Sequence, residues 1–221
     1  MARLILNTMI SLDGVMQAPG GPQEDPSGGF DKGGWVVPYS DDLMGEVMTD
    51  SINKMDALLL GRRTYEIFAA HWPYVTDQGD PIAVPLNRVP KFVASKTLDK
   101  VTWDKTTILS QPVPESVAKL KNETDGEIQV HGSSNLIQTL LQHNLVDEFR
   151  LYVCPVILGE GKRLFDQGTL PDGLELTASK ISPKGVLLLT YQAGGEVETG
   201  SFALEEPTQA EIERRKRNQG A

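Results

Sequence analysis

Cysteine is almost absent from this chain of 221 residues, which contains Cys154 alone. A single cysteine cannot form an internal disulfide, so the sequence favours a reducing compartment and we predict a cytoplasmic protein. Because Cys154 ends an apolar run typical of a buried strand, we expect a packed thiol and not a nucleophile. Long hydrophobic runs are also missing: no stretch approaches ~18 consecutive apolar residues, and we expect neither a membrane span nor a signal sequence.

Positive charge is scarce as well. The chain has 21 lysines and arginines against 30 aspartates and glutamates, a net charge of −9. This balance argues against a long surface for DNA or RNA, so we expect a small-molecule partner and no nucleic acid. Two of the three histidines, His71 and His143, lack carboxylate or cysteine partners at ligand spacing, and we predict no metal site.

The apolar residues follow two alternating periods. Short β-rich runs predict strands, and stretches with apolar residues at helical spacing predict helices between them. Such alternation indicates an α/β fold with a mostly parallel, twisted sheet, and the last two strands form an antiparallel hairpin. We predict one domain over residues 1–195 and a polar tail over 196–221, which is either a solvated helix or a disordered end. The predicted strands are residues 3–8, 57–60, 91–94, 106–109, 128–131, 149–153, 174–181 and 186–192.

Two of these strands run through a single glycine directly into a helix. One turn consists of Gly61, Arg62, Arg63 and Thr64; the other consists of His131, Gly132, Ser133, Ser134 and Asn135. The first turn of a helix has free N–H groups and a partial positive charge, and both favour a phosphate. Neither turn has the glycines of a Rossmann or Walker motif, and each alone is compatible with a plain tight turn. Together they predict two phosphate cradles, residues 61–64 and 131–135.

A third candidate for phosphate binding follows the predicted strand 91–94. Ser95 and Lys96 place a hydroxyl and an ammonium group at its carboxyl end. Such a pair can hold a ribose 2′-phosphate, the group that distinguishes NADPH from NADH. A solvated loop lysine is the alternative. With Arg62 and Arg63 nearby in the predicted sheet, the pair favours NADPH as the cofactor.

These motifs carry a family resemblance over residues 3–193. In order and spacing they resemble the dihydrofolate reductase superfamily, and within it the branch with the reductase domain of the bifunctional riboflavin-biosynthesis deaminase-reductase. The motifs are Ser11-Leu12-Asp13-Gly14, Gly61-Arg62-Arg63-Thr64-Tyr65-Glu66, Val93-Ala94-Ser95-Lys96, His131-Gly132-Ser133-Ser134 and the run from Pro155 to Phe165.

The resemblance implies a dihydrofolate-reductase-like three-layer α/β/α fold and an NADPH-dependent reductase, most often a homodimer. Residues 61–64 with Ser95 and Lys96 would then hold the adenosine phosphates, and residues 132–135 would cover the pyrophosphate. The implied substrate is a small heterocycle or a phosphoribosylaminopyrimidine. In dihydrofolate reductases a Gly-Gly peptide at the second cradle is cis, which raises the same geometry for Gly132-Ser133 here.

The sequence departs from dihydrofolate reductases on the first helix, where those enzymes place a carboxylate against the pterin. The matching position here is Gly45, with Glu46 beside it and Asp42 one turn earlier. This departure weakens dihydrofolate as the substrate. A dihydrofolate reductase and an NADPH-binding module without turnover both remain open as alternatives.

Hydride transfer needs positioning, water exclusion and a proton source. Asp13 and Glu46 are the catalytic candidates; the alternatives are an Asx turn at Asp13 and a solvated helix face at Glu46. Asp42, an alternative helix N-cap, is a candidate substrate contact. Residues 14–34 form a long loop, either a lid or disordered, with Trp35 at its hinge as a further contact. Gly159 and Lys162, with Arg163, form either an anion nest for a phosphorylated substrate or a surface turn.

Overall fold

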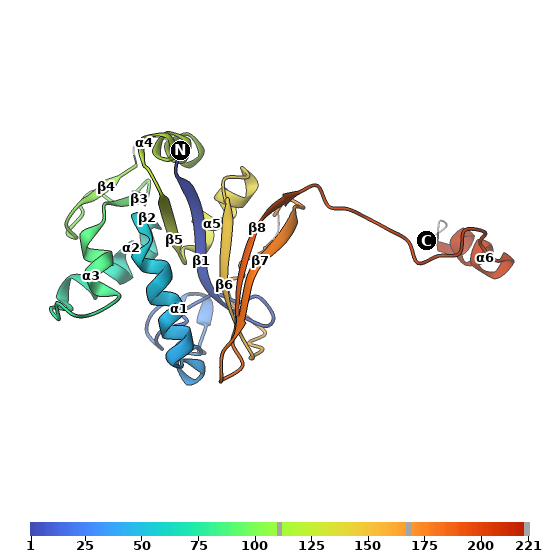
Figure 1. Cartoon of the computed structure of the whole chain (residues 1–221), viewed down its shortest axis with the longest axis horizontal. Helices are drawn as coiled ribbons and strands as arrows, with labels where there is room; N and C mark the ends of the chain where they lie inside the picture. Colours follow the sequence, from blue (N-terminus) through green and yellow to red (C-terminus); the bar gives the residue numbers. More distant parts are fainter. Residues whose placement is uncertain (110–111, 167–168, 219–221) are drawn as a thin grey trace.

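The computed structural model describes residues 1–109, 112–166 and 169–218. Within these residues eight strands form one sheet in the order β4-β3-β2-β5-β1-β6-β8-β7 (Figure 1). All neighbouring pairs from β4 to β6 are parallel, whereas β8 pairs antiparallel with both β6 and β7. The predicted parallel sheet with a C-terminal antiparallel hairpin is confirmed. The strands are β1 (Arg3–Ser11), β2 (Met55–Gly61), β3 (Lys91–Ala94), β4 (Thr106–Ile108), β5 (Glu127–His131), β6 (Glu148–Cys154), β7 (Gly173–Ile181) and β8 (Leu187–Gly195).

Helices cover both faces of the sheet and give the three layers. On one face α4 (Val113–Glu123) and α5 (Ser134–Gln142) bury Leu120 and Ile137 against Leu6 of β1. On the other face α1 (Asp42–Asn53), α2 (Arg62–Ala69) and α3 (Ala83–Arg88) bury Ile52 and Leu86 against β2. Parallel strands need such crossover helices, and the alternation of the sequence reflects them.

Several elements differ from the sequence prediction, among them β1 and α3. Strand β1 continues three residues past its predicted end, to Ser11, because its last residues pair with β6. Helix α3 was not predicted, since prolines at positions 81, 85 and 90 interrupt the periodicity. It forms because the Asp80 carboxylate accepts hydrogen bonds from the amides of Ile82 and Ala83. Short 3₁₀ helices lie at Ser27–Gly29, Val37–Tyr39 and Trp72–Tyr74.

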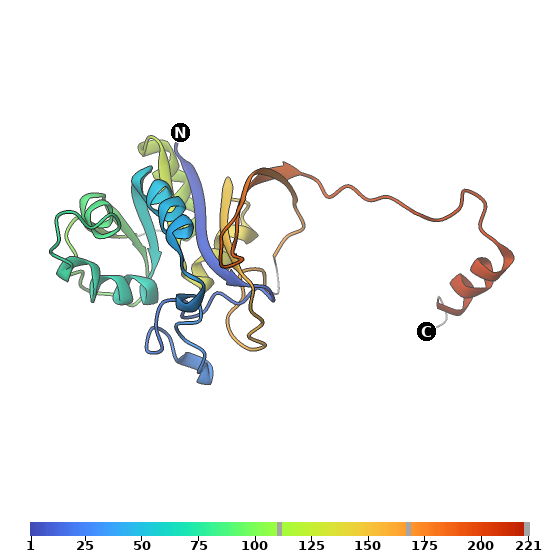
Figure 2. The ribbon, with the colours of Figure 1, turned by 60° about the horizontal axis from the view of Figure 1, so that its bottom comes forward.

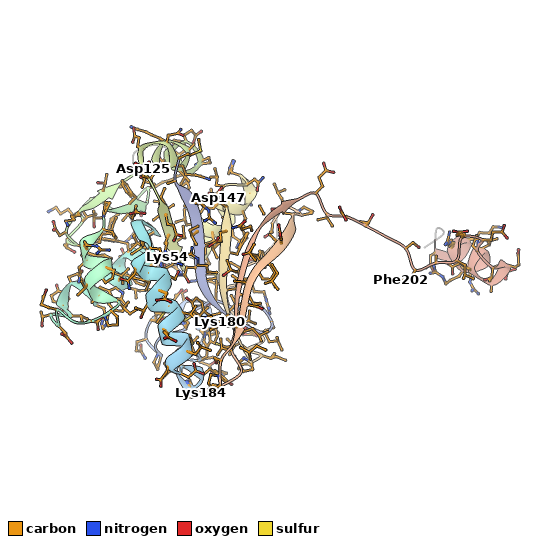
Figure 3. The ribbon with its side chains drawn as sticks, in the orientation of Figure 1. Lys54, Asp125, Asp147, Lys180, Lys184 and Phe202 are labelled. Carbon is orange, nitrogen blue, oxygen red and sulfur yellow. The ribbon has the colours of Figure 1, made fainter. Side chains whose placement is uncertain are left out.

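The chain leaves the sheet after β8. It extends away from the body and ends in α6 (Gln209–Asn218), an exposed helix in which Glu211 pairs with Arg214 and Arg215 (Figure 1). Figure 3 labels Phe202 on this extended segment, far from the sheet and fully exposed. The tail therefore contains a solvated helix, the first of the two predicted alternatives. No helix in the described part of the chain has the length and apolar content to cross a bilayer.

Candidate active site

A cavity of about 1660 Å³ opens where the parallel strands end. This is the edge of an α/β sheet at which ligands usually bind. The structure brings into it every residue that the sequence predicted for the cofactor, from the ends of three strands. These residues are Gly61, Arg62, Arg63, Thr64, Ser95, Lys96, His131, Gly132, Ser133, Ser134 and Asn135.

The first cradle begins at Gly61, which ends β2 and caps α2 without a side-chain hydrogen bond. The amides of the first helical turn are therefore available to a phosphate. A side chain here would be tightly placed, because a Cβ would lie 3.1 Å from both Cβ and Oγ of Ser133. The amide of Gly61 donates to that same Oγ at 2.8 Å. The two phosphate cradles are thus joined by a direct hydrogen bond.

The second cradle turns through two residues in left-handed conformation, Gly132 at φ 72° and Ser133 at φ 63°. Ser133 caps α5, and its side chain gives no hydrogen bond to the helix because it accepts from Gly61. The first amides of α5 remain available in the same way as those of α2. The Gly132-Ser133 peptide is trans, so the cis geometry raised by the family resemblance is wrong for this chain.

Both arginines of the first cradle are half-exposed and lightly tethered. Arg62 donates to Glu66 at 2.7 Å and to Thr97 at 2.6 Å. Arg63 donates to Ser27 of the long loop at 3.0 Å. These exposed contacts contribute little stability and can be exchanged for a phosphate.

Ser95 and Lys96 complete the cationic end of the cavity. The Ser95 hydroxyl oxygen accepts from the amides of Thr97 and Leu98, at 3.2 and 3.0 Å, which leaves its own hydrogen available. Lys96 is exposed. The turn therefore presents a donor and a charge beside Arg62, which already contacts Thr97.

Asp13 is placed differently from its prediction as a proton donor. Its carboxylate accepts from the Ser11 hydroxyl at 2.6 Å and from the amides of Leu158 and Gly159 at 3.0 and 2.9 Å. The Ser11 hydrogen bond is the main cause that lowers the pKa of Asp13 to about 2. It does not line the cavity. Asp13 is thus an ionised turn residue that fixes the loop after β6, and its catalytic role stays a prediction.

The acidic residues of α1 also lie outside the cavity. Glu46 and Asp42 are exposed, and neither lines it. The N-cap is Asp41, whose carboxylate accepts from the amide of Met44 at 3.0 Å. Glu46 and Asp42 thus lie on the solvent face of the helix, and their catalytic and substrate-binding roles stay predictions.

The long loop, residues 14–34, is packed against the body, not disordered (Figure 2, blue, below the sheet). Val15 and Phe30 are buried, and at its end buried Trp35 donates from Nε1 to the carbonyl of Gln17 at 2.8 Å. Trp35 does not line the cavity, and its substrate contact stays a prediction. The loop instead contributes other residues to the wall, among them Gln17 and Glu24.

The predicted anion nest at residues 159–163 is not available to a phosphate. Lys162 lines the cavity, but its ammonium pairs with Asp25 and donates to Ser27 at 2.9 Å. Arg163 turns to the backbone carbonyls of Asp13 and Gly159, and Gly159 lies outside the cavity. Protein groups pair both cations in this structure, and the substrate roles of Gly159 and Lys162 stay predictions.

Sequence reasoning predicted only one of the three residues that form the polar floor of the cavity, His131, and missed the other two. Asn7 of β1, His131 of β5 and Tyr152 of β6 line it from neighbouring strands, and Asn7 and His131 are partners in the β1–β5 register. Burial, with the charge of Arg150, lowers the pKa of His131 to about 4. Burial raises the pKa of Tyr152 to about 12. The only sequence signal was a polar Asn7 that interrupts the apolar run of β1.

Apolar side chains form the wall between this floor and the first cradle. They come from α1, α2, the turn after α2 and α3, and they include an indole and a phenyl ring. A flat ring system fits such a surface, because aromatic and aliphatic groups pack against its faces. The residues are Met48, Ile52, Ile67, Phe68, Trp72, Ile82 and Leu86.

The family described as the RibD C-terminal domain matches residues 2–188, most of the chain and all parts of this cavity. The chain belongs to that family. Among curated proteins, a RibD-family relative is the uncharacterized protein YyaP of Bacillus subtilis (strain 168), 28% identical over 198 residues, which cover 87% of this chain and 96% of the relative.

Two solved structures share the fold of this RibD-type domain. A putative riboflavin biosynthesis protein from Shewanella sp. PV-4 has a TM-score of 0.65 at 22% identity and covers 87% of this chain and 99% of its own. A dihydrofolate reductase from Enterococcus faecalis, complexed with NADP(H), has a TM-score of 0.55 at 15% identity and covers 87% and 96%. The dihydrofolate-reductase-like fold is thereby confirmed.

Proposed function

We propose that this RibD-type domain is an NADPH-dependent reductase that transfers a hydride to a small heterocycle. One observation carries the proposal: two uncapped helix N-termini, two lightly tethered arginines and the Ser95–Lys96 turn line the same cavity. Helix amides bind diphosphate groups, and the cations suit a further ribose phosphate. NADP(H) in the Enterococcus dihydrofolate reductase agrees with this assignment.

Bound NADPH supplies the hydride, and the residues of this chain hold and enclose the reactants. Residues 61–64 and 132–135 bind the phosphates, while Arg62, Arg63 and Lys96 select the 2′-phosphate. The apolar wall excludes water from the stacked rings of the nicotinamide and the substrate. No carboxylate of the first helix reaches the cavity, so dihydrofolate is the weaker alternative.

Among heterocycles, the family relationship makes 5-amino-6-(5-phosphoribosylamino)uracil the first substrate to test. The paired state of Lys162 opposes a dedicated site for its phosphate. Binding of NADPH without turnover of pyrimidine, pterin or carbonyl substrates would favour the alternative of a cofactor-binding module. A homodimer and a cytoplasmic location remain predictions from the sequence.

The test of the cofactor is selectivity. We expect NADPH to raise the melting temperature more than NADH does and to quench the fluorescence of Trp72, which lines the cavity. Replacing Arg62 and Arg63 with alanine removes up to two charge-assisted contacts and weakens NADPH binding by roughly tenfold or more, with little effect on NADH. The exposed Arg88, outside the cavity, is the matched control as Arg88→Ala. Equal responses to both nucleotides would refute the proposal.

A further inference from the structure

Hydride transfer to a C=N or C=O bond leaves its nitrogen or oxygen in need of a proton, which a group in the cavity has to supply. The carboxylates of Asp13, Asp42 and Glu46 do not line the cavity. Among the described residues two carboxylates do line it, and both belong to the long loop: Glu24 and Asp25. These two are the acidic groups that can reach a bound substrate.

The histidine and the tyrosine on the cavity floor are less suited to this task. Burial, with the charge of Arg150, lowers the pKa of His131 to about 4, so its ring is neutral at neutral pH. Burial raises the pKa of Tyr152 to about 12, and so weak an acid is a poor proton donor. His71 is exposed and lines the cavity as well, which makes it the alternative proton source.

Asp25 is engaged by other groups of the protein. Its carboxylate pairs with Lys162 and accepts from the Ser27 hydroxyl at 2.6 Å, and Arg63 lies 3.9 Å away. Although burial opposes it, the hydrogen bonds from Lys162 and Ser27 lower the pKa of Asp25. Asp25 is therefore an ionised residue that holds the loop against two cations of the cavity wall.

Glu24 has different surroundings. No lysine, arginine or histidine pairs with it within the described ranges. Its Oε2 accepts from the amides of Gly20 and Gly21, at 2.6 and 3.2 Å, whereas Oε1 accepts no hydrogen bond from the described residues. Burial, helped by the negative charge of Asp25, raises the pKa of Glu24. This carboxyl group thus holds a proton more readily than an ordinary glutamate and has one oxygen available to a ligand.

The loop is built to keep Glu24 in this place. Gln17 donates from Nε2 to the carbonyls of Asp25 and Ser27, at 2.9 and 2.8 Å, and so fixes the segment on the carboxyl side of Glu24. The buried indole of Trp35 holds the carbonyl of Gln17 in turn. A catalytic group needs such support, because its geometry decides its efficiency.

Glycines fix the segment on the amino side. A Cβ at Gly20 would lie 3.2 Å from Oε2 of Glu24, so the missing side chain lets the amide approach the carboxylate closely. A Cβ at Gly33 would lie 2.5 Å from the carbonyl oxygen of Gly21, where the two arms of the loop pack backbone to backbone. The position of Glu24 is therefore defined by the loop itself.

We infer that Glu24 is the catalytic acid of the proposed reductase, a carboxyl group that reaches the substrate from the long loop and not from the first helix. In the reaction the carbon of a C=N or C=O bond receives a hydride, with its two electrons, from NADPH. The carboxyl proton of Glu24 passes to the nitrogen or oxygen of the same bond. The products are the reduced substrate, NADP⁺ and the Glu24 carboxylate, which regains a proton from water. This role rests on the proposed reductase function and adds its proton source.

The first measurement needs neither cofactor nor substrate. NMR of glutamate side chains labelled at the carboxyl carbon gives the pKa of each, and the signal that is lost in Glu24→Gln is that of Glu24. We expect Glu24 to titrate above the ordinary range of glutamate. Exposed Glu175 of β7, outside the cavity, should titrate in the ordinary range and serves as the reference.

The second measurement is turnover of NADPH with pyrimidine, pterin and carbonyl substrates. Glutamine keeps an oxygen for the amides of Gly20 and Gly21 but has no acidic proton. Glu24→Gln should therefore keep the melting temperature and the NADPH affinity of the wild type, and lose roughly 100-fold or more in kcat with a smaller change in KM. Glu175→Gln and His71→Gln should keep the wild-type kcat.

The dependence of kcat on pH separates a chemical from a structural role. Because the acid must be protonated, wild-type kcat should fall as the pH rises through the pKa of Glu24, and the residual rate of Glu24→Gln should lack this step. Charged groups near Glu24 are Asp25 of the same loop, Lys162 of the loop after β6 and Arg63 of α2, and the two cations lie against Asp25.

The two proposals fail separately. Absent NADPH binding, or no turnover of any substrate in the panel, refutes the reductase, and the catalytic role of Glu24 falls with it. Normal NADPH binding and turnover, with Glu24→Gln as active as the wild type, overturns the role of Glu24 alone. An ordinary pKa of Glu24 does the same, and so does a loss of kcat in His71→Gln with none in Glu24→Gln.

Discussion

His131 gives this protein a specific dependence of stability on pH. Burial, helped by the positive charge of Arg150, lowers its pKa in the folded protein from 6.5 to about 4. In the unfolded chain the imidazole takes up a proton near its ordinary pKa, whereas the folded state resists protonation until the pH approaches 4. The contribution of His131 to the free energy of unfolding is therefore fully present above pH 6.5. It is lost as the pH falls from there toward 4.

The size of the loss follows from the two pKa values. At pH 5 the unfolded state gains about 2 kcal/mol relative to pH 7.5, and the full difference between the two values corresponds to at most about 3 kcal/mol. This is a substantial share of the 5–15 kcal/mol typical of a domain. The carboxylate of Asp13, with a pKa of about 2, contributes only below this window.

Urea unfolding of wild type and His131→Gln at both pH values measures the effect. Glutamine keeps an N–H that can donate to Gln129, so the network beneath the cavity survives. We expect the wild type to lose about 2 kcal/mol more than the variant between pH 7.5 and 5.

Burial raises the pKa of Glu24, which titrates in the opposite sense, but it is common to both proteins and cancels in the difference. His143→Gln, the same change at an exposed site, should behave as wild type. Equal losses in wild type and His131→Gln would refute the buried neutral imidazole.

Two further predictions separate structural from chemical roles. Tyr65→Phe removes the hydroxyl that accepts from the amide of Thr102 at 2.8 Å, and it should lower the free energy of unfolding by about 1–3 kcal/mol in urea titrations, since a half-buried amide loses its partner. Stability equal to that of the wild type would contradict this hydrogen bond. Asp13→Asn should lower the melting temperature, because the ionised carboxylate holds the amides of Leu158 and Gly159, yet leave NADPH affinity unchanged in fluorescence titrations. Weakened cofactor binding at an unchanged melting temperature would restore a direct role for Asp13.

The cofactor end of the site was predictable because its determinants are local. A strand, one glycine and a helix start follow each other within a few residues, and the structure places all these turns at one edge of the sheet. The parallel topology itself makes the carboxyl ends of the strands converge. What local reasoning could not foresee is that Ser133, which lies 72 residues further along the chain, leaves little room for a side chain at Gly61.

The substrate end was not predictable, because its residues meet only through strand register. Asn7, His131 and Tyr152 become neighbours when β5 and β6 pair with opposite edges of β1. In the sequence Asn7 is a single polar residue in an apolar run, and Tyr152 reads as core. Conversely, the position of Asp13 at a strand end favoured a functional role. In the structure its carboxylate accepts hydrogen bonds from the amides of Leu158 and Gly159, and no sequence motif predicts these contacts.

The charges of the cavity bear on which of the proposed substrates fits. Basic residues occur at both ends, and sequence patterns cannot distinguish a free cation from one that is already paired. At the cofactor end Arg62 is tethered through exposed contacts, whereas Lys162 at the other end is partly buried against Asp25. Removing a phosphate group from water costs more free energy than removing the uncharged part of a heterocycle. Only an unpaired cation offsets that cost. A relative whose residue at position 25 is uncharged would free this lysine, and a phosphorylated substrate would then fit the same fold.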